Sequence, residues 1–267
     1  APAHLDRARR MQQRLLPDPA DMPFGDRVQW AGRFLPEAEV GGDLFDVATI
    51  DDRRVAILFC DVSGHGLAAA LVSVIVKTDF HGWIEHGGAL ADFLEQLNLD
   101  LCRMTLEDNF AAVVACVYDS VTGDLEYANC GHHPEPFVAQ AAGRSVKRLA
   151  AAGSLLLGVS EDLLPTTASC RLEPGETLFF ATDGITESTN ADGRMFGIGR
   201  LERLLARAPR TDLETLVRRI IRASDRFGAD ALDHDDRTVL ALRRRPGRPA
   251  RCASPAAADY APDASLA

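Results

Sequence analysis

The sequence has few aromatic residues and no cysteine spacing typical of a zinc site or a redox pair. Phe, Trp and Tyr make up 6% of the 267 residues, so a core drawn from the 46% of hydrophobic residues must be mainly aliphatic. None of the six cysteines belongs to a C-x-x-C pair, which argues against structural zinc and against a disulfide framework. We expect buried free thiols at Cys60, Cys102, Cys116, Cys130, Cys170 and Cys252.

An excess of basic residues is also missing, as is a long hydrophobic run. The chain has 29 Lys and Arg against 39 Asp and Glu, and its formal net charge of -10 argues against a general nucleic-acid-binding protein. No apolar run approaches the roughly 18 residues that cross a bilayer, and no secretory segment follows the N-terminus. We therefore expect a soluble, cytoplasmic protein whose segment here contacts neither membrane nor nucleic acid.

What the sequence does contain is four short acidic segments, spread over roughly two hundred residues. Each places an Asp within three residues of a Gly or another Asp, at the expected end of a strand. Carboxylates gathered from distant strand ends are typical ligands of hard divalent cations such as magnesium and manganese. The sequence thus predicts metal-assisted chemistry on a phosphate. The segments are VGGD (residues 40–43), DVSGHG (61–66), TDG (182–184) and HDDRT (234–238).

The pattern of apolar residues predicts an α+β protein with largely antiparallel sheets. Residues 55–60 form an apolar run that ends at Asp61, and residues 177–181 repeat this arrangement before Asp183. Helices and strands come in blocks rather than in strict alternation, which argues against a doubly wound parallel fold. We expect helices over residues 68–75 (buried on nearly every side), 89–106 and 211–227, and a hairpin turn at residues 122–124.

Three regions are expected along the chain. Residues 1–20 form an N-terminal helix or linker, residues 21–244 form one domain, and residues 245–267 form a Pro- and Ala-rich tail that we expect to be disordered. The first helix has only a thin apolar stripe, made of Leu5, Ala8, Met11 and Leu15. Such a helix either continues from an upstream domain or pairs with a copy of itself, or it lies on its own domain. Both alternatives stay open.

Several motifs, in this order, resemble those of the metal-dependent PPM (type 2C-like) protein phosphatases, and within them the bacterial SpoIIE/RsbU branch. The resemblance covers residues 12–242, which is essentially the whole expected domain. The matching segments are QRLLP (13–17), VGGDLFD (40–46), DVSGHG (61–66) with AAAL (68–71), LN (97–98), YANCGH (127–132), PGE (174–176), TDGITE (182–187), FG (196–197) and DDRT (235–238).

The resemblance implies a serine/threonine phosphoprotein phosphatase with a four-layer αββα sandwich, in which two central antiparallel sheets are flanked by helices. It also implies two manganese or magnesium ions at one end of the sandwich. Their shared hydroxide is expected to attack the phosphoester directly, without a covalent phosphoenzyme. Asp61 matches the ligand that bridges both ions, and the Val62 carbonyl and Asp43 match ligands of the second ion.

Asp183 and Asp235 match the carboxylates that secure the first ion. Asp236 is the alternative to Asp235, which we prefer because the family ligand is the first residue of the pair. Each of these aspartates could instead serve only in a turn or a helix cap. His65 is a candidate general acid, because histidine as a residue type can exchange protons near neutral pH, although two extra residues separate it from Asp61 compared with the shorter Asp-Gly-His-Gly loop of type 2C enzymes.

The resemblance also suggests partners. The usual substrate in this branch is a phosphorylated anti-sigma-factor antagonist, a small STAS-domain protein. The N-terminal helix is then expected to connect an upstream sensor or receiver domain to assembly of the metal site, and it offers a surface for a homodimer. Two other functions stay open: a catalytically silent domain that acts as a regulatory binding module, and a phosphoesterase of small molecules on the same fold.

Overall fold

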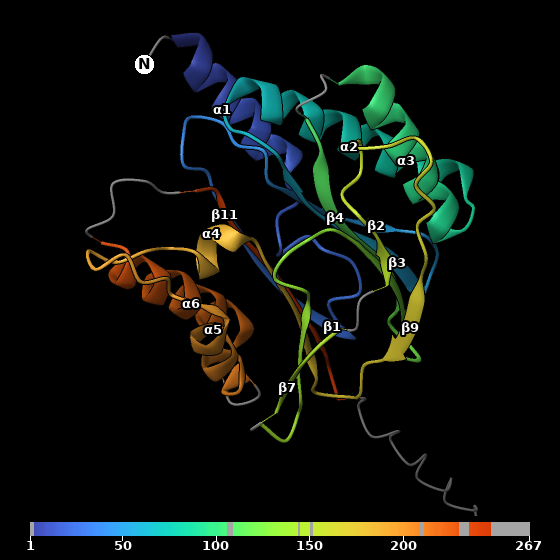
Figure 1. Cartoon of the computed structure of the whole chain (residues 1–267). Helices are drawn as coiled ribbons and strands as arrows, with labels where there is room; N and C mark the ends of the chain where they lie inside the picture. Colours follow the sequence, from blue (N-terminus) through green and yellow to red (C-terminus); the bar gives the residue numbers. More distant parts are fainter. Residues whose placement is uncertain are drawn as a thin grey trace, which may run out of the picture.

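The computed structural model describes residues 3–105, 109–143, 145–149, 152–208, 211–229 and 235–246. Two β-sheets lie face to face, and helices cover the outer face of each sheet (Figure 1). This four-layer αββα arrangement confirms the predicted fold class.

The first sheet has five strands in the order β1-β11-β10-β6-β7, and all of its pairs are antiparallel. Strands β10 and β11 pair within this sheet, so the strand that ends just before Asp183 lies beside the strand that starts just after Asp236. Its strands are β1 (Val28–Leu35), β6 (Phe137–Ala139), β7 (Val146–Arg148), β10 (Thr177–Ala181) and β11 (Arg237–Arg244).

The second sheet follows the order β2-β3-β4-β5-β8, and β9 also pairs with β5. All pairs except the short parallel β5–β8 pair are antiparallel. The predicted hairpin joins β4 to β5 through Gly123, whose φ of 83° suits glycine. The strands are β2 (Leu44–Thr49), β3 (Arg54–Val62), β4 (Ala111–Asp119), β5 (Asp124–Cys130), β8 (Gly153–Ser154) and β9 (Ala168–Arg171).

Three clusters of buried apolar residues hold the four layers together. The cluster between the sheets includes Phe59 and Phe180, whose stacked rings lie 5.4 Å apart. A second cluster joins the second sheet to α2 and α3, and a third joins the first sheet to α5 and α6. The helices are α1 (Ala3–Leu15), α2 (Leu67–His86), α3 (Leu90–Met104), α4 (Asp183–Thr186), α5 (Ile198–Leu205) and α6 (Leu213–Phe227).

Helix α2 differs from the prediction in length and in burial. It continues from the predicted end near residue 75 to His86, because the polar residues that follow lie on the helix surface and do not break it. Only one face is buried, through residues such as Val72, Val76 and Phe80, whereas Leu67 and Leu71 are 55% and 59% exposed. The prediction of a helix buried on nearly every side was therefore wrong.

By length and composition alone, α2 is also apolar enough to cross a membrane, contrary to the expectation that no segment comes close. In the structure its inner face packs into the core cluster beneath the second sheet. We therefore describe α2 as a helix of the domain core.

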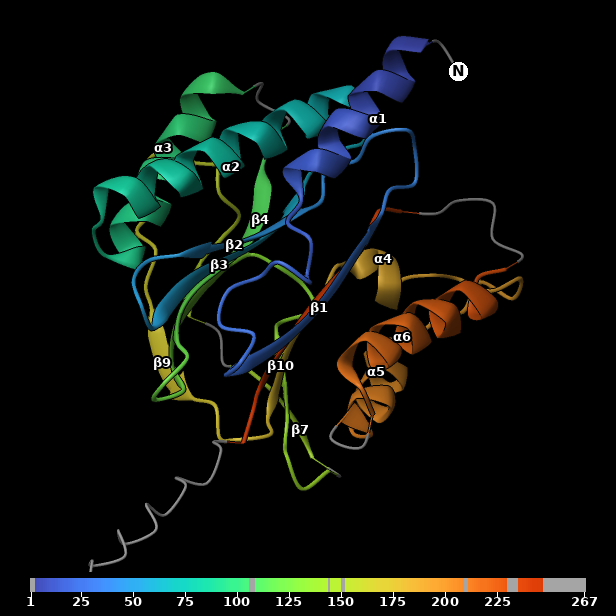
Figure 2. The ribbon, with the colours of Figure 1, turned by 180° about the vertical axis from the view of Figure 1, so that it is seen from behind.

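Helix α1 crosses the N-terminal part of α2 in the two opposite views of the ribbon (Figures 1 and 2). Within the predicted apolar stripe, Met11 is 66% exposed, whereas Ala8 and Leu15 are half-buried. Gln12, which is buried, and Leu16 just after the helix contact the domain. Beyond Pro246, the tail predicted over residues 245–267 lies outside the described residues.

Candidate metal and active site

The predicted aspartates come together at the end of the sandwich that carries α4 and the start of β11 (Figure 1). Asp43 lies just before β2, Asp61 near the end of β3, and Asp183 at the start of α4 directly after β10. Asp235 lies two residues before β11. Four strand ends that are distant in sequence thus bring four carboxylates to one place, as the sequence predicted.

Asp43 is the most deeply buried of these carboxylates, with 2% of its surface exposed. Burial raises its pKa well above the ordinary range, and the negative charges of Asp61 and Asp236 raise it further. The Thr238 hydroxyl on β11 donates a hydrogen bond to Asp43 Oδ2 at 2.5 Å and partly offsets this effect. The sequence reasoning missed Thr238, although it belongs to the matched DDRT segment.

Asp236 holds the loop that carries Asp43. Its Oδ1 accepts the Glu37 N–H at 2.8 Å, and its Oδ2 accepts the Gly42 N–H at 2.7 Å. A Cβ added to Gly41 would lie 1.9 Å from Asp236 Oδ2, and one added to Gly42 would lie 2.7 Å from the Val62 carbonyl oxygen. Both glycines are therefore needed for this close approach, which also brings the Val62 carbonyl next to the Asp43 loop.

Asp61 and Asp183 are partly buried and repel other carboxylates. Burial and, to a lesser extent, the charges of Asp183, Asp235 and Asp236 together raise the pKa of Asp61 to about 7. Burial, together with the charges of Asp235 and Glu187, raises the pKa of Asp183 to about 6. Several negative charges are thus held close together, and bound divalent cations would stabilise this arrangement.

The two members of the acidic pair have different surroundings. Asp236 is 8% exposed and uses both carboxylate oxygens on backbone N–H groups. Asp235 is exposed, accepts the Asp236 N–H at Oδ1, and has no hydrogen bond to Oδ2 from the part of the chain that is described. The geometry therefore favours Asp235 as a metal ligand and gives Asp236 a role in positioning the loop.

The donor set fits hard divalent cations, although it does not form a complete cage. Within the described ranges, no three side chains of His, Cys, Asp or Glu are arranged so that they alone could hold a metal ion. Magnesium and manganese prefer oxygen ligands, and magnesium usually keeps several waters. Aspartates that supply only part of the coordination sphere, together with the Val62 carbonyl, are compatible with that preference.

His65 lies in the loop between Asp61 and α2 and is exposed. Gly64 and Gly66 on either side have φ values of 84° and 75°, so the loop depends on both glycines. Ser63 bonds this loop to residue 110, because its hydroxyl accepts the Phe110 N–H at 2.9 Å. A general-acid role for His65 stays a prediction.

His132, in the matched YANCGH segment, is buried with its ring edge against Phe59, the ring centres being 5.2 Å apart. Its Nδ1 lies 3.1 Å from the Pro134 carbonyl oxygen, so the ring donates there as the neutral tautomer. Burial lowers the pKa of His132 to about 4. This surrounding suits a structural role near the site.

Gln12 on α1 is a further residue whose role the sequence did not reveal. Its side-chain amide donates to the Gly41 carbonyl at 2.6 Å and accepts the Gly41 N–H at 3.1 Å. The helix thus contacts the same loop that Asp236 holds from the other side. The only sequence signal for this contact is that Gln12 comes directly before the matched QRLLP segment.

Solved structures share this fold. The SiaA-PP2C domain of Pseudomonas aeruginosa superposes with a TM-score of 0.78 at 22% identity, covering 90% of this chain and 96% of that one. The catalytic domain of the phosphatase PstP, solved in complex with two manganese ions, has a TM-score of 0.58 at 14% identity, covering 82% and 99%. The structure of RsbX in complex with magnesium has a TM-score of 0.61 at 14% identity, covering 82% and 96%.

The sequence is also similar to curated proteins of Bacillus subtilis (strain 168). Phosphoserine phosphatase RsbP is 26% identical over 189 residues, which cover 69% of this chain and 45% of RsbP. Phosphoserine phosphatase RsbU is 25% identical over 243 residues, which cover 91% of this chain and 70% of RsbU. A sequence profile of the family described as "Stage II sporulation protein E (SpoIIE)" matches residues 51–245, more than half of the chain. The chain therefore belongs to the SpoIIE family.

Proposed function

We propose that this chain is a metal-dependent protein phosphatase that hydrolyses phosphoserine or phosphothreonine. The observation that carries the proposal is the group of carboxylates Asp43, Asp61, Asp183 and Asp235. The burial of the first three and the mutual repulsion within the group favour divalent cations. Membership of the SpoIIE family and similarity to two phosphoserine phosphatases support it. The chain spans 45% of the length of RsbP, so the activity of the whole relative is not carried over unchanged.

Two manganese or magnesium ions would supply a water activated for in-line attack on phosphorus. Asp61 would contact both ions. The interaction of its charge with Asp43, Asp183 and Asp235 supports this role. Asp43 would hold the second ion together with the Val62 carbonyl, and its orientation is kept by the Thr238 hydroxyl. Asp183 and Asp235 would hold the first ion.

The exposed His65 would donate a proton to the leaving serine or threonine oxygen. Its loop begins at the end of β3, directly after the proposed bridging ligand, and it has no hydrogen bond or ion pair in the described part of the chain that would restrain the ring. An exposed ring on a glycine-flanked loop can reach a bound substrate without rearranging the core.

The resemblance to the RsbU branch supports a phosphorylated anti-sigma-factor antagonist with a STAS domain as the substrate. We place the reaction in the cytoplasm as part of this proposal. The contact between Gln12 and Gly41 supports a regulatory role for the N-terminal helix, because that contact connects α1 to the Asp43 loop. An upstream sensor domain, or a second copy paired through α1, would then act on the site through the position of this helix.

The test is manganese-dependent release of phosphate from an aryl phosphate and from a phosphoserine peptide. We expect activity in the wild-type chain and none in the Asp61→Asn and Asp183→Asn variants. Asp162→Asn, which changes an exposed aspartate outside the site, is the matched control and is expected to stay active. Binding of manganese without turnover would favour the catalytically silent binding module, and hydrolysis of the aryl phosphate alone would favour a small-molecule phosphoesterase.

A further inference from the structure

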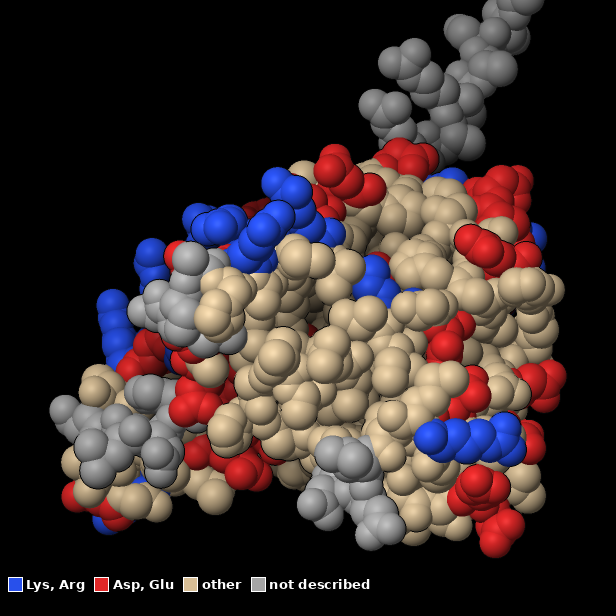
Figure 3. Space-filling view, turned by 90° about the horizontal axis from the view of Figure 1, so that it is seen from above, with Lys and Arg blue, Asp and Glu red and all other residues tan. Residues whose placement is uncertain are grey.

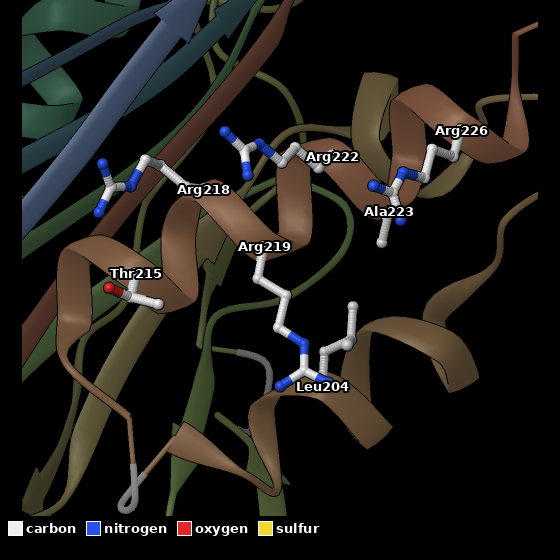
Figure 4. A pocket seen from close by; sticks show the side chains of 7 residues that line it. All are labelled: Leu204, Thr215, Arg218, Arg219, Arg222, Ala223 and Arg226. Atoms are coloured by element: carbon white, nitrogen blue, oxygen red, sulfur yellow. The ribbon is translucent and has the colours of Figure 1, made fainter.

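The outer face of α6 carries four arginines, although the chain as a whole has a net charge of -10. Arg218 and Arg222 extend from one side of the helix, the guanidinium of Arg226 lies near Ala223, and Arg219 points toward Leu204 on α5 (Figure 4). Seen from above, Lys and Arg gather on the side of the molecule where α1 and α6 lie, and they are sparse elsewhere on that face (Figure 3). Basic charge is therefore concentrated here rather than spread evenly.

Three of these arginines are not neutralised by the rest of the described structure. Arg219, Arg222 and Arg226 are exposed, and no carboxylate oxygen of a described residue lies within 4.0 Å of their guanidinium groups. The acidic residues of α6 are already engaged. Glu214 pairs with Arg33 and lies 3.9 Å from Arg218, and Asp225 pairs with Arg237.

The arginines line a cavity of about 670 Å³ between α5 and α6, which we call the arginine groove. Seven positions from Arg219 to Arg226 correspond to about 10 Å along a helix. That length matches three or four residues of an extended peptide. The groove is lined by Leu204, Thr215, Arg218, Arg219, Arg222, Ala223 and Arg226.

The C-terminal end of α6 is hydrogen-bonded to α4, the short helix that begins at the proposed ligand Asp183. The Ser224 hydroxyl is fully buried and donates to the Ile185 carbonyl at 3.1 Å, within the short helix α4 that begins at Asp183. The ion pair from Asp225 to Arg237 reaches the strand that follows Asp236. The groove therefore starts beside the elements that carry Asp183 and Asp235.

We propose that the arginine groove binds an acidic segment of the phosphoprotein substrate, as a second contact outside the metal site. This inference rests on the proposed phosphatase function. Guanidinium groups bind carboxylates and phosphates through paired hydrogen bonds, and at an exposed site the cost of desolvating the two charges is smaller than in the protein interior. A short acidic segment of three or four residues complements both the sign of the charge and the length of the groove.

A protein segment fits this surface better than a nucleic acid or a membrane. Nucleic-acid-binding domains are usually basic overall, whereas this chain is acidic. A membrane-bound helix usually places large apolar side chains beside its basic ones, and none of the strongly exposed large apolar residues in the described structure lies on α6.

The experiment compares two phosphoserine peptides, one joined through a flexible linker to six glutamates and the other to six glutamines. The groove variant Arg219→Gln/Arg222→Gln/Arg226→Gln is measured beside a control variant, Arg54→Gln/Lys147→Gln/Arg171→Gln, which removes the same charge from exposed positions elsewhere. In the wild-type chain and the control, we expect the glutamate tract to lower KM by about tenfold at low salt with kcat unchanged. The groove variant should lose this preference, and so should the wild-type chain in about 0.5 M salt.

Equal KM values for the two peptides in the wild-type chain would overturn the proposal, as would an equal loss of preference in both variants. It would also be overturned if the groove variant kept the peptide preference but lost binding to a DNA duplex or to phosphatidylserine vesicles. Hydrolysis of the aryl phosphate separates the two proposals. If neither the wild-type chain nor the two variants hydrolyse it, the proposed phosphatase function is wrong. Direct binding of a labelled six-glutamate peptide to the wild-type chain and to the groove variant then still tests the arginine groove.

Discussion

The two charged regions of this molecule hold like charges in opposite surroundings. At the proposed metal site, Asp43 is 2% exposed and Asp61 is partly buried, so burial raises the pKa values of both carboxyl groups and repulsion between carboxylates raises them further. In the arginine groove, Arg219, Arg222 and Arg226 are exposed, and water screens their repulsion. Buried like charges are costly and therefore indicate a bound counter-ion, whereas exposed like charges cost little and favour recognition of a partner.

The largest expected effect comes from removing a charge at the buried site. Asp61→Asn should lower metal-dependent phosphatase activity by about a thousandfold or more, because the ligand proposed to bridge both ions is lost. Without metal, the same variant should raise the Tm at pH 8 by about 2–4 °C, since it relieves carboxylate repulsion. Calorimetry with and without manganese checks both signs, and a lower Tm in the metal-free variant would contradict the assigned repulsion.

The next largest effect is expected at the glycine loop that precedes Asp43. Gly41→Ala should lower the free energy of unfolding by about 3 kcal/mol and abolish activity, because the added Cβ would meet Asp236 Oδ2 at 1.9 Å. Gly82→Ala on α2 is the matched control, since no atom lies within 4 Å of a Cβ placed there. Denaturant unfolding should show the control unchanged or slightly more stable, and equal losses in both variants would refute the tight-approach argument.

A buried neutral histidine should make stability depend on pH. The pKa of His132 is about 4 in the folded state and about 6.5 when unfolded, so the unfolded chain alone gains a proton as the pH falls between these values. The free energy of unfolding therefore falls in this range. Relative to His132→Asn, which does not titrate, the wild-type chain should lose about 2 kcal/mol between pH 7.5 and pH 5. A constant difference between the two proteins across this range would show that His132 is not buried as described.

The smallest effect is expected at α1. Gln12→Ala removes both hydrogen bonds to Gly41 and should weaken manganese binding about threefold to tenfold, because the Asp43 loop becomes less restrained. Gln13→Ala changes the exposed neighbour and should bind manganese like the wild-type chain. Calorimetric titration measures both affinities. Equal affinities in the two variants would limit Gln12 to a structural contact.

The sequence allowed the acidic site to be predicted more closely than its surroundings. Four aspartates could be named because each lies at the end of a recognisable strand and has a glycine or a second aspartate nearby in the sequence. They are Asp43, Asp61, Asp183 and Asp235. The different roles of Asp235 and Asp236 could be ranked only by resemblance. The full length of α2 was missed because its surface residues beyond residue 75 break the apolar pattern without breaking the helix.

The sequence alone determined the α+β class, the antiparallel hairpin and the four acidic strand ends, since periodicity and turn residues act over a few positions. Only the tertiary structure decided which side chains meet. The bond from Thr238 to Asp43 and the bond from Gln12 to Gly41 join residues 195 and 29 positions apart. That Arg219, Arg222 and Arg226 meet no carboxylate among the described residues likewise depends on where Glu214 and Asp225 find their partners. Contacts between residues so far apart in sequence depend on how the layers pack, and no local sequence pattern predicts them.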